Sequence, residues 1–392
     1  MKATKWKSYS LALIAGMSVL TACSSDDNND NGGNGNNGNG NEIENGTTLK
    51  GTITSDVTLT AGSTYKLSGE YIVEDGATLN IEAGVKIISI YDDIVDYILV
   101  KQGGKINAVG TAPIVMTSEK EEPGAWGGIH ICGKAHTNAE GGKGSSEIGG
   151  ATYGGNDDAD NSGTLKYVRV EYSGYAFDSE HEANGITFYG VGNGTTVEYC
   201  QAYKGSDDGF EFFGGSVNVS NLVSVSCSDD SFDWTEGWNG TATNLVAYQE
   251  AEETLGYDCD CLIEADNNEN NYAATPVAHP VLKNLILVGN NSAAGNRGIR
   301  LRRGTQVEID GAKVCGKKNA VTLESEETEN ALLAGTSKLA NMTVDSELRS
   351  EKNIYTNDNF VSAGNTVDTS LKYTSFDDIK AECEWMAGNW VK

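Results

Sequence analysis

The chain of 392 residues carries 56 acidic and 28 basic side chains, so its formal net charge is −28 at pH 7. A charge of this sign opposes binding to nucleic acid or anionic lipid and suits cations and neutral glycans. The 48 glycines, four prolines and lack of long helical periodicity also argue against a helical body.

Residues 1–22 have the pattern of a bacterial lipoprotein signal peptide. Three lysines precede the apolar stretch 11–20, which is too short to span a bilayer, and small residues then lead to Cys23. The sequence "LTAC" resembles a lipobox, whose cysteine becomes the lipidated N-terminus after cleavage. This resemblance implies lipidation of Cys23 and a lipid anchor in the outer membrane; a secretory signal with a chance cysteine is the alternative.

Residues 23–46 are rich in Asn, Gly and Asp and contain almost nothing apolar to bury. Such a composition predicts a disordered tether. Its first residues, "CSSDD", resemble the acidic export tag that places lipoproteins on the outer face of Bacteroidetes cells. The resemblance implies exposure on the cell surface.

Residues 47–345 contain short β-rich runs, bounded by Gly, Asn and Asp, that recur about every twenty residues. Examples are "LKYVRVEYSG" and "ITFYGVGNGTTVEYCQAY". Matched positions at a period of about 20–25 residues predict an all-β solenoid, in which each repeat forms one coil. Coils stack at about 4.8 Å, so residues one period apart lie above one another.

The clearest repeat joins "SDDGFEFFGG" with "SDDSFDW" further along the chain. The Ser-Asp-Asp triplet at 206–208 recurs at 228–230, and the aromatic run 210–212 aligns with 232–234. Stacking predicts an aromatic ladder inside the solenoid. Asparagines at coil corners, including Asn221 and Asn244, are expected to take left-handed conformations or to stack as amide ladders.

Five motifs in order, "DGATLNIEAGVKI", "GAWGGIHICGKA", "DDADNSGTLKYVRVEYSG", "SDDGFEFFGG" and "DDSFDW", resemble a family of secreted or lipid-anchored β-helix proteins common in Bacteroidetes. The resemblance covers roughly residues 50–310. It implies a right-handed parallel β-helix on the cell surface and brings no settled activity.

Two segments depart from the repeat. Residues 250–280 are too long for an ordinary corner and are expected to form a projecting loop. Residues 346–392 are expected to form the last coil and a C-terminal cap, because an open solenoid end exposes unpaired strands. The seven cysteines after Cys23 are irregularly spaced, which excludes a disulfide framework or a zinc site but leaves one disulfide open.

Stacking places Asp207 and Asp208 against Asp229 and Asp230, with Glu211 beside Asp233. Each such pair at about 5 Å costs on the order of 1 kcal/mol or more in repulsion. Backbone N–H groups can cap these carboxylates, calcium can bridge them, or one carboxyl can stay protonated for catalysis.

The catalytic interpretation rests on a resemblance. "SDDGFEFFGG" resembles the Asp-Asp corner of β-helix polygalacturonase-type hydrolases, which implies that Asp207, Asp208, Asp229 and Asp230 activate water and protonate the glycosidic oxygen. "NRGIRLRR" resembles their later basic strand, with Arg300 or Arg302 binding a substrate carboxylate. The Gly-His-Gly corner of those enzymes is missing here, so hydrolysis is the alternative function.

Two further groups are candidate binding residues. Asp158, Asp160 and Ser162 alternate before Gly163, as in the first half of an EF-hand loop, and so are candidate calcium ligands. The closing glutamate is absent, because Arg169 occupies the twelfth position, and an Asx-rich turn is the alternative. Trp238 is a candidate for stacking on a sugar ring, together with Glu211 and Asp233 as candidate binding residues. The alternative role of Trp238 is packing in the core.

Together these features predict a surface lipoprotein whose rigid, acidic β-helix binds a glycan or another surface polymer, with calcium stiffening one or more corners. Nucleic acid is not an expected partner, and the membrane is contacted through the lipid anchor only. The alternatives are a polysaccharide-degrading glycoside hydrolase and a structural spacer or adhesin.

Overall fold

The structure is a computed structural model that describes residues 41–177, 181–293 and 295–392. The predicted signal peptide, Cys23 and most of the predicted tether lie outside these residues. Strand β1, Asn41–Ile43, pairs with β3. The first coil therefore begins within the segment predicted as a tether, at 41 and not at 47.

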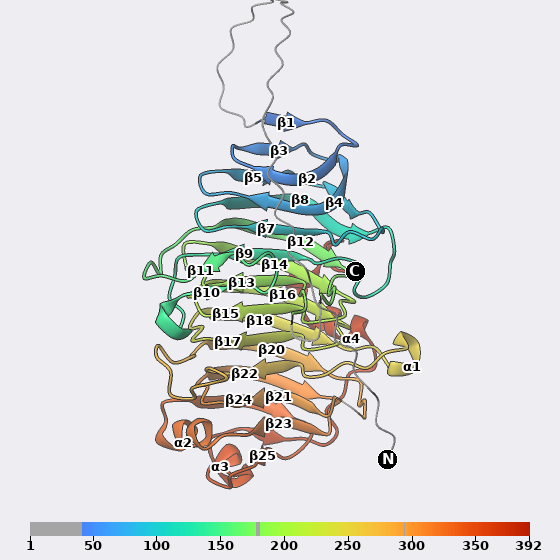
Figure 1. Cartoon of the computed structure of the whole chain (residues 1–392). Helices are drawn as coiled ribbons and strands as arrows, with labels where there is room; N and C mark the ends of the chain where they lie inside the picture. The colour runs from blue at the N-terminus through green and yellow to red at the C-terminus, as the bar shows by residue number, and fades with distance from the viewer. Residues whose placement is uncertain (1–40, 178–180, 294) are drawn as a thin grey trace, which may run out of the picture. The chain divides into compact units, whose positions relative to one another are not determined.

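The described residues wind into a right-handed parallel β-helix, which confirms the predicted fold class (Figure 1). One sheet of 24 strands, all paired in parallel, follows the winding chain. Its first stack contains β1, β3 (Val57–Leu59), β5 (Thr78–Ile81), β8 (Lys105–Ser118), β12 (Gly163–Glu171), β14 (Thr196–Tyr203), β16 (Asn218–Val225), β18 (Thr241–Tyr248), β20 (Val281–Val288), β22 (Glu308–Cys315), β24 (Lys338–Val344) and β26 (Thr366–Val367).

A second stack runs beside the first one. It contains β2 (Thr48–Ile53), β4 (Thr64–Val73), β7 (Tyr97–Val100), β9 (Ile129–Cys132), β13 (Ile186–Tyr189), β15 (Phe210–Phe213), β17 (Phe232–Thr235), β19 (Ile263–Ala265), β21 (Arg297–Leu301), β23 (Asn319–Leu323) and β25 (Arg349–Ser350), while β6 (Lys86–Ser89) joins β4 to β8. A short antiparallel pair, β10 (Gly144–Ser145) and β11 (Thr152–Tyr153), lies in a side loop.

Aromatic rings fill the middle coils, as the repeat predicts. Phe210 pairs with Phe232, and their rings stack with centroids 5.5 Å apart. Phe212 pairs with Trp234 in register, but its ring stacks on Trp238 at 4.2 Å. These side chains are almost fully buried. The ladder therefore supplies a large apolar area to the narrow core that the coils enclose.

Residues 250–280 do not form a single projecting loop, contrary to the prediction. The segment begins with a helical turn, α1 (Glu252–Leu255), and then returns to the sheet as β19, which pairs with β17 and β21. Ile263 and Ala265 point inward and are fully buried, whereas Glu264 lies between them on the outer face. The sequence did not reveal this strand, because its alternation of inward and outward side chains is short and lies among acidic residues.

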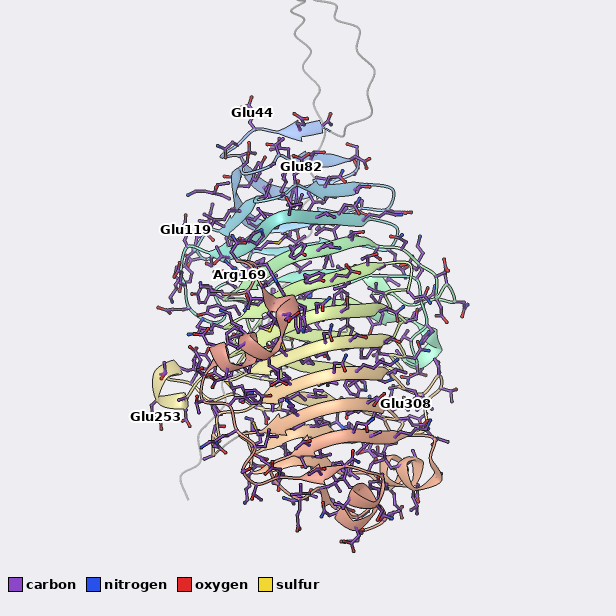
Figure 2. The ribbon with its side chains drawn as sticks, turned by 180° about the vertical axis from the view of Figure 1, so that it is seen from behind. Glu44, Glu82, Glu119, Arg169, Glu253 and Glu308 are labelled. Atoms are coloured by element: carbon purple, nitrogen blue, oxygen red, sulfur yellow. The ribbon has the colours of Figure 1, made fainter. Side chains whose placement is uncertain are left out.

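Residues 346–392, the predicted last coil and cap, divide between two places. Their first helix, α3 (Asn357–Ser362), lies at the end of the stack beside α2 (Glu326–Ala334), which precedes the predicted cap (Figure 1). The final segment, with α4 (Phe376–Glu382) and the 3-10 turn η2 (Glu384–Met386), instead packs along the side of the coils (Figure 2). Arg169 donates to the carbonyls of Asn389 and Trp390 there. This segment therefore covers outward-facing apolar residues and does not close the last coil.

The seven described cysteines are buried and form no disulfide. Among the described residues, no helix is long and apolar enough to cross a bilayer.

Candidate functional site

Three consecutive coils carry the same acidic pattern where the turn enters the second stack. It reads Asp-Asp-x-x-Glu at 207–211, Asp-Asp-x-x-Asp at 229–233 and Asp-Cys-x-x-Glu at 260–264. The strands β15, β17 and β19 pair so that Glu211, Asp233 and Glu264 form one column. The vertical registry that the sequence predicts for 207–212 and 229–234 is thus present, and a third row extends it.

Backbone groups fix the turn acids in place. The Asp230 N–H donates to Asp208 Oδ1 over 2.9 Å, and the Cys261 N–H donates to Asp230 Oδ1 over 2.6 Å. Each carboxylate thereby caps the coil below it, which is the turn role expected of Asp. Capping engages Oδ1 of each of these two carboxylates.

These rows line a cavity of about 350 Å³. Ten of its twelve lining residues are acidic, and the other two are Asn184 and Arg300. The acids are Glu147, Glu182, Asp207, Asp208, Glu211, Asp229, Asp230, Asp233, Asp260 and Glu264. Such a wall of one charge sign needs protons or cations to persist in a folded protein.

The protonation states reflect this crowding. Burial, followed by repulsion from neighbouring acids, raises the pKa of five carboxyls well above the usual range: Asp207, Asp208, Glu211, Asp230 and Asp233. The same causes raise the pKa of Asp229 to about 6. Burial also raises the pKa of Glu147 to about 7, against a hydrogen bond from Tyr189.

The carboxylates fit a divalent cation in their spacing. Five overlapping groups of three side chains bring their ligand atoms within 4.8 Å of one another, and four of the five groups contain carboxylates only. Calcium binds oxygens at about 2.3–2.6 Å, so two oxygens on opposite sides of one ion lie roughly 4.8 Å apart. Asp233 Oδ1 is buried and accepts no hydrogen bond within the described residues, so it is a further oxygen suited to such an ion.

The candidate arginines flank the acids and are paired with them. Arg300 follows Glu264 in the column and contacts Glu264 at 2.5 Å and Glu324 at 3.0 Å. Arg302 binds Glu264 and Asp266. Of the two arginines, Arg300 lines the cavity, and its guanidinium is paired there with Glu264 and Glu324.

Two of the predicted binding groups do not line the acidic cavity: Trp238, and the set of Asp158, Asp160 and Ser162. Trp238 is 1% exposed and packs against Phe212 in the core, so its predicted contact with a sugar is wrong and its alternative role applies. Asp158 Oδ1 lies 2.6 Å from His136 Nδ1, whereas Asp160 accepts from the Ser162 hydroxyl at 3.2 Å. These two carboxylates thus have separate partners, and neither belongs to the metal-competent groups found among the described residues.

Sequence reasoning missed five residues of the site. Asp260 and Glu264 keep the four-residue spacing of the first two rows, and that spacing was the signal available. Asn184, which donates to Glu211 at 2.5 Å, precedes the same kind of strand one coil earlier. Glu147 and Glu182 reach the cavity from side loops, for which the repeat carries no signal.

The fold and this acidic face define a parallel β-helix protein with an anionic cavity on its side. The chain belongs to the family described as the pectate-lyase-like beta helix domain, which matches residues 51–392. Comparison with curated proteins finds no match.

Proposed function

We propose that this protein binds polysaccharide through calcium held in the acidic cavity. The observation that carries the proposal is the convergence of ten carboxylates on one cavity, with a buried oxygen of Asp233 left without a hydrogen bond among the described residues. The membership of a pectate-lyase-like family supports a polysaccharide as the ligand.

The substrate class follows from charge. Without cations the cavity repels acidic sugars, whereas bound calcium supplies positive charge at the same place. Calcium takes six to eight oxygen ligands, so three carboxylates leave coordination positions for oxygens from a sugar. A polysaccharide containing uronate gains most, because its carboxylate is attracted to the bound calcium at one of these open positions.

Glycoside hydrolysis is the second candidate, and the raised pKa values favour it. Burial raises the pKa of Asp229 to about 6, so a larger fraction of this carboxyl is protonated near neutral pH than of an ordinary aspartate, as a general acid requires. However, the carboxylate oxygens within each of the groups of three lie within 4.8 Å of one another, which is closer than the roughly 6.5–9.5 Å of inverting hydrolysis and near the roughly 5–5.5 Å of the retaining mechanism. This spacing fits a bridging cation better than an intervening water.

The test compares the wild type with Asp230→Asn/Asp233→Asn. Asp93→Asn, at an exposed acid that does not line the cavity, is the matched control. Calorimetric titration of calcium into chelator-treated protein should show binding in the wild type and the control and at least tenfold weaker binding in the double variant. Oligogalacturonate should then bind only with calcium present.

Absence of calcium binding, or equal affinity in the double variant, would refute the proposal. Release of reducing sugars without unsaturated ends, lost in Asp208→Asn and Asp230→Asn, would establish the hydrolase instead. If no polysaccharide binds and deletion of the protein changes only cell attachment, the spacer or adhesin alternative would hold.

The proposal also places the protein on the outer surface of the cell, held in the outer membrane by a lipid on Cys23. Its support is the sequence "LTAC" followed by "CSSDD", which resembles the signals of Bacteroidetes lipoproteins. Metabolic labelling with an alkyne fatty acid should mark the wild type and not Cys23→Ser. Antibody binding to intact cells tests the exposure, and a protein that is unlabelled or inaccessible would contradict this placement.

A further inference from the structure

One corner of the coils repeats an unusual backbone conformation. Seven coils in succession place a residue with positive φ at the same register position, where each long strand turns from one face to the next. Their φ values range from 54° to 84°, and the residues are Tyr167, Tyr199, Asn221, Asn244, Asn284, Gly311 and Asn341.

The asparagines of this corner column form a ladder with one missing step. Asn244 Nδ2 donates to Asn221 Oδ1 at 2.8 Å, and Asn284 Nδ2 donates to Asn244 Oδ1 at 3.3 Å. The next coil has Gly311, so the ladder stops there. Below it, Asn341 donates sideways to Asp310 at 2.6 Å.

Steric crowding does not require a glycine at this step. A Cβ added to Gly311 would meet Asn284 Oδ1 at 3.5 Å, an ordinary van der Waals contact. Asparagine occupies the same corner in four other coils at φ values of 54–61°, so an asparagine at position 311 fits once the φ of 84° there shifts toward theirs. A hollow of about 340 Å³ opens beside Gly311 and is lined on the ladder by Asn244, Asn284 and Asn341.

The C-terminal segment forms the other wall of this hollow with Trp385 and Cys383. The segment is held on both sides of these residues. Glu382 accepts from Tyr373 at 2.7 Å and pairs with Lys313, while the Lys392 N–H donates to Gln201 at 2.7 Å. Trp385 therefore lines the hollow from a fixed segment, and its side chain remains partly exposed.

We propose that this hollow binds a neutral pyranose residue of a glycan. An indole ring covers the apolar face of such a sugar, and the amides of the ladder donate to and accept from its hydroxyls. Lys313 and Glu382 neutralise each other, so the lining favours an uncharged ligand. The volume lies within the range of about 300–1,000 Å³ found for small-molecule pockets.

This site is independent of the acidic cavity. The cavity lies at the turns that enter β15, β17 and β19, whereas the hollow lies at the corner within β18, β20, β22 and β24. Sugar binding in the hollow needs no calcium.

The experiment fills the missing step of the ladder. Saturation-transfer NMR and calorimetry would measure binding of cellotetraose, xylotetraose, mannotetraose and laminaritetraose to the full protein in EDTA. Gly311→Asn should abolish binding or weaken it at least tenfold, while the variant stays folded with a thermal midpoint close to that of the Gly62→Asn control. Gly62→Asn, at another positive-φ glycine with open space around it, is the matched control and should bind as the wild type does.

A second variant covers the aromatic wall. Trp385→Ala should also lose binding, and Trp385→Phe should restore part of it, since a smaller ring still covers the sugar. Asp230→Asn/Asp233→Asn should leave this binding unchanged, which separates the two sites. If none of the four oligosaccharides binds the wild type, or if Gly311→Asn binds as tightly as the wild type, the proposal is overturned.

Discussion

Replacing Asp229 by asparagine should stabilise the calcium-free protein, and the gain should grow with pH. Burial, then repulsion from Asp260 and Glu264, raises the pKa of Asp229 from 3.8 to about 6. Between these values the folded protein holds more protons than the unfolded chain, so its stability falls as the pH rises. At about 1.4 kcal/mol for each pKa unit, the full cost is about 3 kcal/mol above pH 6.

Asparagine carries no charge and removes this cost. The expected gain is about 3 kcal/mol at pH 8 and less than about 1 kcal/mol at pH 4. With about 2.1 cal/mol/K of unfolding entropy per residue over roughly 350 residues, the gain at pH 8 raises the thermal midpoint by about 4 °C. The assay is thermal denaturation in EDTA at pH 4, 5 and 8, with Asp93→Asn as the control.

The comparison with the wild type isolates Asp229. Burial lowers the pKa of His130 to about 4, which gives a pH slope of the opposite sign, but both proteins contain this histidine. With saturating calcium the sign should reverse, because Asp229→Asn removes a ligand. A variant that is less stable than the wild type in EDTA at pH 8, or that gains equally at pH 4 and pH 8, would refute the reasoning.

Three other substitutions test the packing and the polar contacts, each by denaturation. Trp238→Ala should cost about 3–5 kcal/mol, because it empties a buried ring site in the core; a loss below 1 kcal/mol would contradict the stacking on Phe212. Glu329→Gln should cost about 3 kcal/mol at pH 7, since the buried carboxylate accepts a hydroxyl and three backbone N–H groups. These bonds lower the pKa of Glu329, so the loss should shrink as the pH falls through that value, and a constant loss would be inconsistent with a charge effect. Lys317→Met should cost about 2–4 kcal/mol, because it leaves the buried carbonyls of Cys259 and Gly295 without their donor, and a neutral result would argue against those bonds.

The first two rows of the site were predictable because their coils are alike. Asp208 and Asp230 are 22 residues apart, with the same turn before the same kind of strand. The third row follows after 31 residues, because the chain first forms α1, and this longer interval concealed Glu264. A search for a strict period therefore detects coils of equal length and overlooks a coil that contains an insertion.

The errors at Trp238 and at the C-terminus share another cause. Both predictions depended on which side of a strand or turn is buried, and the amino-acid composition does not determine which side that is. Val223, Val246 and Ile286 lie on the outside of the coils and are buried only because the C-terminal segment covers them. In the sequence these three valine and isoleucine side chains look like core residues, so nothing there indicated that α4 would pack over them.

The column of Glu211, Asp233 and Glu264 has a consequence for how such a surface can change in evolution. Each row belongs to one turn of the winding chain, so duplication or loss of a single genetic unit of about 22 residues would lengthen or shorten the anionic track by one 4.8 Å increment. The reach of this face along a polymer is therefore adjustable in whole steps, without redesign of the rows that remain.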